Sequence, residues 1–205
     1  MKPLLLEMKE KKVAIFGGGE VGLRKARFFL PEASVVVVSK DFVPGFQGLS
    51  VQRIEGDIDL VMERWIDWAD FVVAATHDPE LNERISKKSE ARGRFFNSAD
   101  KPGNFLIPSV VSRDNFIIAI STLGRSPGMS KFMRIKLDRE LGKEYSSMIS
   151  LQEELREIAK VVITNQASRE KFLWKVLNDE RVWSRIAIDY HAAKQLALAE
   201  LEEFK

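Results

Sequence analysis

The chain has 205 residues, contains no cysteine, and balances 32 Lys and Arg against 30 Asp and Glu for a net charge of +2. This composition excludes disulfides and cysteine zinc sites, and the low net charge disfavours a general nucleic-acid-binding protein. No apolar run approaches the roughly 20 residues of a membrane-spanning helix, and nothing at the N-terminus is typical of an export signal. We therefore expect a cytoplasmic protein with neither a nucleic-acid nor a membrane partner.

Residues 1–113 are predicted to form a dinucleotide-binding α/β domain. Continuous apolar runs suit strands that are buried on both faces of a parallel sheet, and helical segments separate them. Asp78 and Pro79 are expected to open one of these helices as its N-cap and its first residue. This alternation predicts a Rossmann-type parallel sheet. The predicted strands are 13–16, 35–38, 71–76 and 94–97.

Gly17, Gly19 and Gly22 follow the first predicted strand and open the next helix in the spacing Gly-x-Gly-x-x-Gly. In this fingerprint the first glycine permits a tight turn, the second lets the backbone approach a pyrophosphate, and the third lets the helix pack closely on the strand. The N-terminus of the helix attracts the phosphates. The flanking strand and helix make a dinucleotide site the favoured interpretation.

The acid that binds the ribose hydroxyls is expected about 20 residues further on, at the end of the second strand. Ser39, Lys40 and Asp41 stand there, and Asp41 is two residues late. Asp41 favours NAD, whereas Lys40 could accept the 2′-phosphate of NADP. Both cofactors stay open at this point.

The second region, 114–150, is predicted to hold a strand at 116–121, a glycine-rich loop and a helix at 129–142. Between residues 121 and 143 six basic residues stand against two acidic ones. In the loop, Arg125 is suited to pair with a substrate carboxylate. The other basic residues form either a receptor for a polyanionic small molecule or a solvated helix face.

The third region, 151–205, is predicted to be entirely helical. Ser150 and Glu153 form a capping-box pattern, and Ser168 and Asp179 are expected to cap two further helices. The predicted fold class is therefore α/β, with a Rossmann-type parallel sheet domain followed by a small α+β region and a C-terminal helical domain.

Asp100 follows the predicted strand 94–97, so it would lie at the carboxyl edge of the sheet, where open α/β sheets bind ligands. This position makes it a candidate general base. The alternative is a turn cap, because the segment from Asn97 to Asn104 is rich in turn-forming residues.

Several of these motifs occur in a fixed order along the chain, namely Pro3-Leu-Leu-Leu, Gly17 to Arg27, Ala74-Ala-Thr76, Asn82, Asn97-Ser-Ala-Asp100, Phe105-Leu-Ile-Pro-Ser109, Ala119-Ile-Ser-Thr122 and Ser126-Pro127. In this order they resemble the precorrin-2 dehydrogenases of siroheme synthesis, which occur alone or as the N-terminal part of siroheme synthase. The resemblance covers nearly all of the chain to about residue 177.

The resemblance implies an NAD-dependent enzyme that oxidises precorrin-2, a tetrapyrrole with many carboxylates, to sirohydrochlorin, with Asp100 as the catalytic aspartate. It also implies a homodimer in which 114–150 is the dimerisation region. Some members of the family insert ferrous iron into sirohydrochlorin, and this activity stays open here; no resident metal site is predicted. The residues expected to bind NAD are Gly17, Gly19, Glu20, Val21, Gly22, Ser39, Asp41, Phe42 and Thr76. Those expected to bind the substrate are Asn97, Thr122, Arg125 and Ser126.

Two other functions are compatible with these residues. A non-enzymatic NAD sensor would bind the nucleotide in the first domain and pass the signal through the helical tail. A Rossmann oxidoreductase for another polyanionic substrate would keep Asp100 and the basic helix. Replacing Asp100 by Ala distinguishes an enzyme from a sensor, because the enzyme would lose its catalytic activity and the sensor would keep its function.

Overall fold

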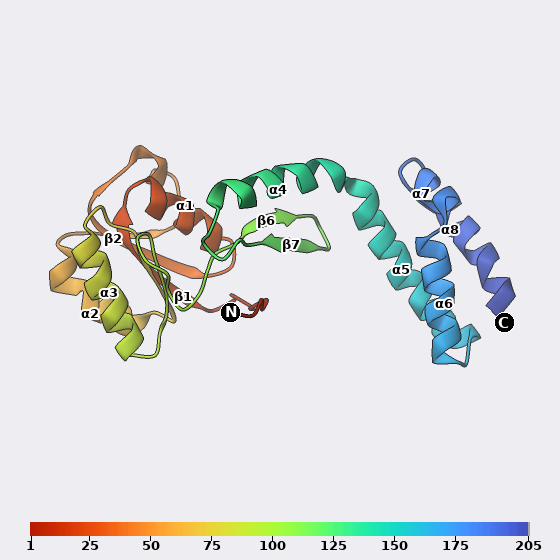
Figure 1. Ribbon diagram of the computed structural model, residues 1–205, viewed down its shortest axis with the longest axis horizontal. Coiled ribbons are helices and arrows are strands. Elements are labelled where there is room, and N and C mark those ends of the chain that lie inside the picture. Colours follow the sequence, from red (N-terminus) through yellow and green to blue (C-terminus); the bar gives the residue numbers. More distant parts are fainter. Residues whose placement is uncertain (205) are drawn as a thin grey trace. The chain divides into compact units, whose positions relative to one another are not determined.

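A computed structural model describes residues 1–204, and the chain divides into two compact units, Met1–Ile107 and Pro108–Lys205. Unit 1 is an α/β layer, and unit 2 combines a β-hairpin with helices (Figure 1). Every helix within residues 1–204 is too short or too polar to cross a bilayer.

Unit 1 is built on a five-stranded parallel sheet in the order β3-β2-β1-β4-β5, with helices on both faces. This confirms the predicted Rossmann-type sheet. Its strands are β1 (Lys12–Gly18), β2 (Ser34–Phe42), β3 (Gln52–Glu55), β4 (Phe71–Ala74) and β5 (Phe95–Ser98). Its helices are α1 (Glu20–Phe29), the short η1 (Pro44–Phe46), α2 (Ile58–Trp68) and α3 (Pro79–Ala91).

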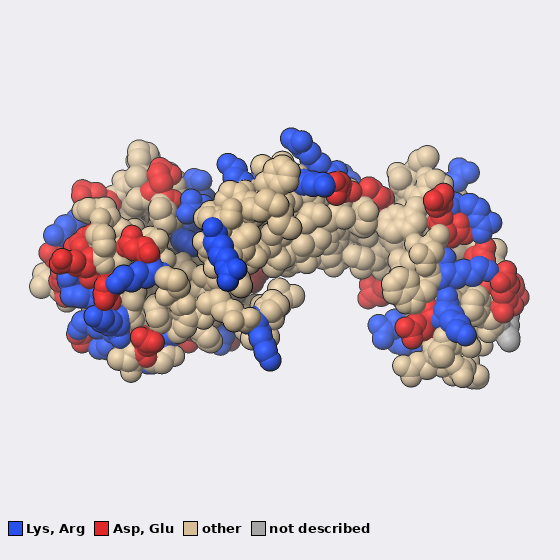
Figure 2. Space-filling model, in the orientation of Figure 1, with Lys and Arg blue, Asp and Glu red and all other residues tan. Residues whose placement is uncertain are grey.

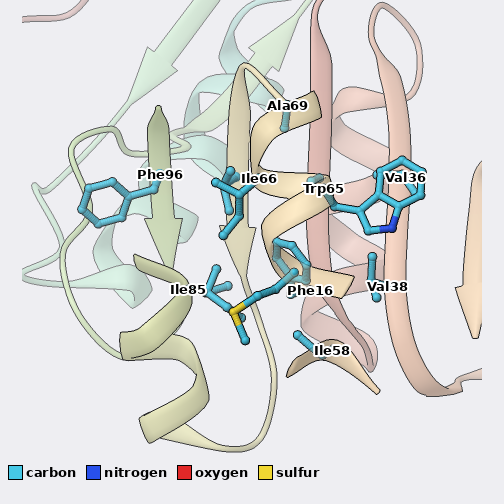
Figure 3. Close-up of a cluster of buried hydrophobic side chains, with 13 residues drawn as sticks. Phe16, Val36, Val38, Ile58, Trp65, Ile66, Ala69, Ile85 and Phe96 are labelled. Atoms are coloured by element: carbon cyan, nitrogen blue, oxygen red, sulfur yellow. The ribbon is translucent and has the colours of Figure 1, made fainter. Parts of the chain in front are cut away.

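Alternate residues of the central strands pack into two apolar layers, one on each face of the sheet. Val13 and Ile15 of β1 belong to the layer that α1 covers. Ala14 and Phe16 belong to the opposite layer, which α2 and α3 cover, and Figure 3 shows Phe16 and Ile85 in that layer. Because both faces are buried, the strands are continuous apolar runs, and the sheet holds the turns at its edges in place.

The predicted start of α3 is confirmed. Asp78 Oδ1 accepts hydrogen bonds from the N–H groups of Glu80, at 2.9 Å, and Leu81, at 3.2 Å, and Pro79 is the first helical residue. This cap satisfies donors that have no partner inside the helix. It also fixes the point at which the chain leaves the edge of the sheet after β4.

Unit 2 begins with an antiparallel hairpin of β6 (Ser109–Ser112) and β7 (Ile117–Ile120), on which α4 (Pro127–Glu140) packs. Arg113, in the hairpin turn, donates from Nη2 to the carbonyls of Asp138, at 2.8 Å, and Leu141, at 2.7 Å, at the end of α4. The predicted boundary after residue 113 falls inside this hairpin. Since the two strands share their hydrogen bonds, the division lies after Ile107 instead.

The remaining helices of unit 2 enclose one apolar core that includes Met148, Leu151 and Leu155. The predicted boundary at 150/151 falls inside α5, because Met148 and Leu151 lie on the same buried stripe and the helix continues through Ser150. The capping-box interpretation of Ser150 is therefore wrong. These helices are α5 (Lys143–Val162), α6 (Gln166–Leu177), α7 (Glu180–Ile186), α8 (Tyr190–Glu200) and the short η2 (Leu201–Phe204).

Of the two further caps, one is confirmed and one is wrong. Asp179 caps α7, because its Oδ1 accepts from the N–H of Arg181 at 2.8 Å. The residue that caps α6 is Asn165, whose Oδ1 accepts from the N–H of Ser168 at 3.1 Å. Both Asn and Ser favour the N-cap position, so composition alone does not separate them.

Candidate active site

The turns that follow β1, β4 and β5 lie at one edge of the sheet, because these strands are parallel neighbours. Gly17 has a φ of +121°, and a Cβ there would lie 2.2 Å from the carbonyl oxygen of Ala75, after β4. A Cβ on Gly22 would lie 2.0 Å from the carbonyl oxygen of Gly17. Both positions therefore require glycine, and the turn after β1 packs directly on the turn after β4 and on the first turn of α1.

The N-terminus of α1 is open. Gly19 is its N-cap, no side chain among residues 1–204 caps it, and a Cβ on Gly19 would meet no atom within 4 Å. The first N–H groups of a helix have no partner inside it, so they face this open space. Glu20 is exposed in the first turn, and Val21 packs against the α1 layer of the core. The pyrophosphate of a dinucleotide fits this place, because the helix offers free N–H groups and the positive end of its dipole and leaves room for a ligand.

The late position of Asp41 is compensated by a bulge in β2. Phe16 lies opposite Val38, but Gly18 lies opposite Phe42, so β2 holds two more residues than β1 over this stretch. The bulge places the exposed Asp41 beside the glycine turn, with Ser39 next to Gly18. β2 thus extends past the predicted end at residue 38, and the sequence spacing alone does not show this.

Lys40 is held by an acidic partner. Its Nζ lies 2.9 Å from Oδ2 of Asp57, the N-cap of α2, whose Oδ1 accepts from the N–H of Asp59. The hydrogen bond to Asp57 raises the pKa of Lys40, and the same bond lowers the pKa of Asp57. Both groups are exposed and ionised, so the charge of Lys40 is already matched by a carboxylate.

Asn82, on α3, connects the turn after β4 to Asp100. Its Oδ1 accepts from the backbone N–H of Thr76 at 3.0 Å and lies 2.9 Å from the Thr76 hydroxyl. Its Nδ2 donates to the Thr76 carbonyl, at 3.1 Å, and to Oδ2 of Asp100, at 2.6 Å. The structure thus brings Thr76 and Asp100 together through a side chain that is only 1% exposed.

The loop that carries Asp100 is anchored to β5. Asn104 accepts from the N–H of Phe96 at 2.7 Å and donates to the carbonyl of Arg94 at 2.9 Å. Asn97, inside β5, is buried and donates to the carbonyl of Phe105 at 3.2 Å. Its amide therefore holds the returning chain, and the predicted substrate contact through Asn97 stays a prediction.

Asp100 itself is exposed. Within residues 1–204 its carboxylate accepts a hydrogen bond from the Asn82 side chain and none from a backbone N–H of its own turn. The turn-cap alternative is therefore wrong. One carboxylate oxygen is fixed by an amide donor, and the other has no partner among the described residues and can accept a proton.

Thr122, Arg125 and Ser126 lie in unit 2, where they surround the start of α4. Ser126 is the N-cap of α4, and its Oγ accepts from the N–H of Met129 at 3.2 Å. The Thr122 hydroxyl donates to the carbonyl of Ser126 at 3.0 Å and lies 3.1 Å from the Ser130 hydroxyl. The two hydroxyl residues thus shape the loop, while the Arg125 guanidinium is exposed with no ion pair in the described part of the chain.

Sequence reasoning assigned no role to Asn82, Asp57 or Asn104. Asn82 had a detectable signal, because it shares the buried face of α3 with Ile85 and Ser89 at helical spacing. A polar residue at such a core position requires partners. The ion pair of Asp57 with Lys40 and the hydrogen bonds of Asn104 to Phe96 and Arg94 had no such signal, since they join residues that are 8 to 17 positions apart. In residues 1–204 no three His, Cys, Asp or Glu side chains are grouped so that they could hold a metal ion.

The glycine turn, the open end of α1 and the parallel sheet define a dinucleotide-binding Rossmann protein. A family model described as "Putative NAD(P)-binding" matches residues 4–109. A precorrin-2 dehydrogenase of Methanosarcina barkeri is 37% identical over 98% of this chain and 94% of its own length. A siroheme synthase of Shigella boydii is 30% identical over 90% of this chain, which matches 41% of that longer protein.

A solved structure, "SirC, precorrin-2 dehydrogenase", has the same fold, with a TM-score of 0.68 at 22% identity and full coverage of both chains. This chain belongs to the precorrin-2 dehydrogenase family, as its 37% identity over nearly the whole length shows.

Proposed function

We propose that this enzyme oxidises precorrin-2 to sirohydrochlorin with NAD as the oxidant. The observation that carries this proposal is the Asp100 carboxylate, which Asn82 holds at the same sheet edge as the open N-terminus of α1. Family membership supports the substrate, and the NAD(P)-binding family match supports the cofactor.

NAD held by the glycine turn and the N-terminus of α1 would supply the acceptor for a hydride from a carbon of the macrocycle. Loss of the hydride leaves a cation, and loss of a neighbouring proton completes the new double bond. We assign the proton to the unpaired oxygen of Asp100, because the other oxygen is occupied by the Asn82 amide. The chain therefore contributes a fixed proton acceptor and a phosphate cradle, while the redox chemistry belongs to the cofactor.

We further propose that the enzyme prefers NAD to NADP. Asp41 lies beside the glycine turn, where it is suited to accept from ribose hydroxyls. Lys40, the cation that could receive a 2′-phosphate, is paired with Asp57. A 2′-phosphate would have to compete with that carboxylate for Lys40 and would be repelled by Asp41.

The basic residues of α4 are the part of unit 2 that we assign to the carboxylates of the substrate, together with Arg125, Thr122 and Ser126. Lys and Arg side chains project over α4 in Figure 2. Lys131 and Arg139 have no ion pair in the described part of the chain, and Lys136 has only a loose one with Glu140, at 3.8 Å. Unmatched positive charge of this kind steers and orients a polyanion.

We also propose that the enzyme is a homodimer that associates through the hairpin and α4. Apolar side chains are exposed there, among them Ile117 (55%) on β7 and Phe132 (59%) and Met129 (47%) on α4. Large apolar side chains exposed on both elements make this part of unit 2 a candidate association site. Sedimentation should show a dimer, and Phe132→Asp should produce monomers; a wild-type monomer at all concentrations contradicts this assignment.

The deciding experiment is anaerobic incubation with enzymatically generated precorrin-2 and NAD, followed by the spectra of NADH and sirohydrochlorin. The wild type should form both products together. Asp100→Ala should lower kcat by about 100- to 10,000-fold, the usual contribution of general acid–base catalysis, and keep its NAD affinity. Asp114→Ala, which removes an exposed carboxylate of unit 2, is the control and should retain activity. Binding of NAD without either product would instead support a sensor.

A further inference from the structure

We propose that Asn82 is the positioning residue of this active site. Its side-chain amide sets the orientation of the Asp100 carboxylate and hydrogen-bonds to the turn after β4. The proton acceptor is therefore fixed relative to the edge of the sheet where we expect the nucleotide to bind. This inference rests on the proposed function of Asp100.

The Asn82 amide is hydrogen-bonded through both its oxygen and its nitrogen. A primary amide offers two donors and two acceptor sites. Asn82 Oδ1 accepts from the Thr76 N–H and lies 2.9 Å from the Thr76 hydroxyl, whose one proton is shared with the Asp78 carbonyl at 3.0 Å. The Thr76 carbonyl and Asp100 Oδ2 take the two donors. No rotation of the amide preserves these contacts, so its position dictates where Asp100 Oδ2 lies.

Packing does not explain an asparagine at this position. Asn82 is 1% exposed on the face of α3 that also carries the buried Ile85. An apolar side chain there would add to the core, whereas a buried amide costs free energy unless all its partners are present. The polar residue is therefore retained for the contacts that it makes with Thr76 and Asp100.

The other contacts of this loop do not orient the Asp100 side chain. Asn104 anchors the loop to β5 through backbone groups, and Lys101 pairs with Glu83 at 2.6 Å. Neither contact reaches the Asp100 carboxylate. An exposed carboxylate without a fixed donor samples several rotamers, so the single bond from Asn82 selects the one in which the free oxygen is the proton acceptor.

Among the described residues the Asp100 carboxylate makes no ion pair. The Asp78 carboxylate accepts from two N–H groups at the start of α3, and Glu83 is matched by Lys101 and Lys87. A charge placed at position 82 would lie within hydrogen-bond distance of Asp100.

The test is Asn82→Asp, which keeps the size of the side chain, removes the amide donor and puts a like charge beside Asp100. We expect kcat to fall about 10- to 100-fold, the scale of a small misplacement of a catalytic group. A neighbouring like charge raises the pKa of a carboxylic acid, so the acidic limb of the kcat/KM profile should move up by about one pH unit or more. The pH shift separates positioning from a merely structural role.

Asn82→Ser decides the question if the Asp variant does not fold, because it keeps a hydroxyl that is too short to reach Asp100. It should lower kcat by a larger factor than it raises the Kd for NAD, measured by calorimetry, because Asp100 loses its amide donor whereas the phosphate cradle on α1 keeps all its residues. Ser89→Ala is the matched control; it removes another buried polar side chain from the same face of α3, far along the helix from Asp100, and should keep the wild-type kcat and pH profile.

The outcomes separate this inference from the proposed function. If Asp100→Ala abolishes turnover while both Asn82 variants keep the wild-type kcat and pH profile, Asn82 does not position Asp100. If Asp100→Ala itself keeps full turnover, the proposed role of Asp100 fails, and with it the basis of the inference.

Discussion

Some polar side chains are buried at the sheet edge of unit 1, whereas in the helical part of unit 2 polar side chains lie near the surface. At the sheet edge Asn82 is buried and makes four hydrogen bonds. Among the described residues 143–204 every buried side chain is apolar, and the polar ones pair near the surface, as Glu154 does with Lys194 and Tyr190.

This difference separates the parts of the chain by what they contribute. A buried polar group replaces apolar contacts that would stabilise the fold, and such groups occur mostly at binding or catalytic sites. Burying only apolar groups maximises stability. Unit 1 therefore fixes polar side chains at its sheet edge, whereas the helices α5 to α8 enclose an apolar core.

The strongest test is Leu155→Ala, in the core of the helical part, where Leu155 is fully buried. The free energy of unfolding of unit 2 should fall by about 2–5 kcal/mol, because the change removes buried methyl groups and leaves a cavity. The Kd for NAD should not change, since the phosphate cradle is in unit 1. Denaturant unfolding and calorimetry measure the two quantities. Val161→Ala on the same helix, where Val161 is 86% exposed, should change stability by less than about 0.5 kcal/mol.

Two glycine variants in unit 1 distinguish an effect on folding stability from an effect on NAD affinity. Gly17→Ala forces a Cβ to 2.2 Å from the Ala75 carbonyl oxygen at a φ of +121°, so it should cost about 1–3 kcal/mol of stability or more and also lower NAD affinity. Gly19→Ala adds a methyl group to open space, so it should keep the stability and lower only the affinity. Equal affinity of Gly19→Ala and the wild type would mean that the pyrophosphate does not lie against α1.

Asp57→Asn tests the choice of cofactor. Loss of the carboxylate frees Lys40, which can then pair with a 2′-phosphate, so the affinity for NADP relative to NAD should rise about tenfold, the scale of one charge-assisted hydrogen bond. Calorimetric titration with each nucleotide measures this ratio. Asp67→Asn makes the same charge change at the other end of α2, where Asp67 pairs with Arg92, and should leave the ratio unchanged.

The smallest effect is expected from Glu83→Gln. Hydrogen bonds from Lys101 and Lys87 lower the pKa of Glu83 from 4.5 to about 2. A lowered pKa means that the carboxylate stabilises the folded state above the unfolded pKa and loses this contribution as the pH falls to 2. Wild type and variant should therefore differ slightly at pH 7 and converge near pH 2 in thermal unfolding. A difference that is the same at both pH values would contradict the assignment. The exposure of the pair keeps the effect small.

Much of unit 1 follows from local patterns. The apolar runs, the glycine turn and Asp78 with Pro79 each specify a strand, a turn or a helix start through neighbouring residues, and the structure contains all of them. β3 escaped detection because its residues, Gln52–Glu55, form no apolar run. The strand exists because β2 offers it hydrogen bonds.

The predicted boundaries at 113 and 150/151 fall inside the β6–β7 hairpin and inside α5 for the same reason. Composition changes near these points, but the pairing of β6 with β7 and the continuous buried stripe of α5 depend on partners that a linear pattern does not contain.

The class of this protein follows from the glycine fingerprint and the ordered motifs, because both are local patterns along the chain. The arrangement of the site depends on contacts between elements. The bulge that moves Asp41 beside the glycine turn, the pairing of Lys40 with Asp57 and the amide of Asn82 on Asp100 each join residues that lie on different elements. Such contacts form when the elements pack, so they are decided by the folded sheet and not by the spacing along the chain.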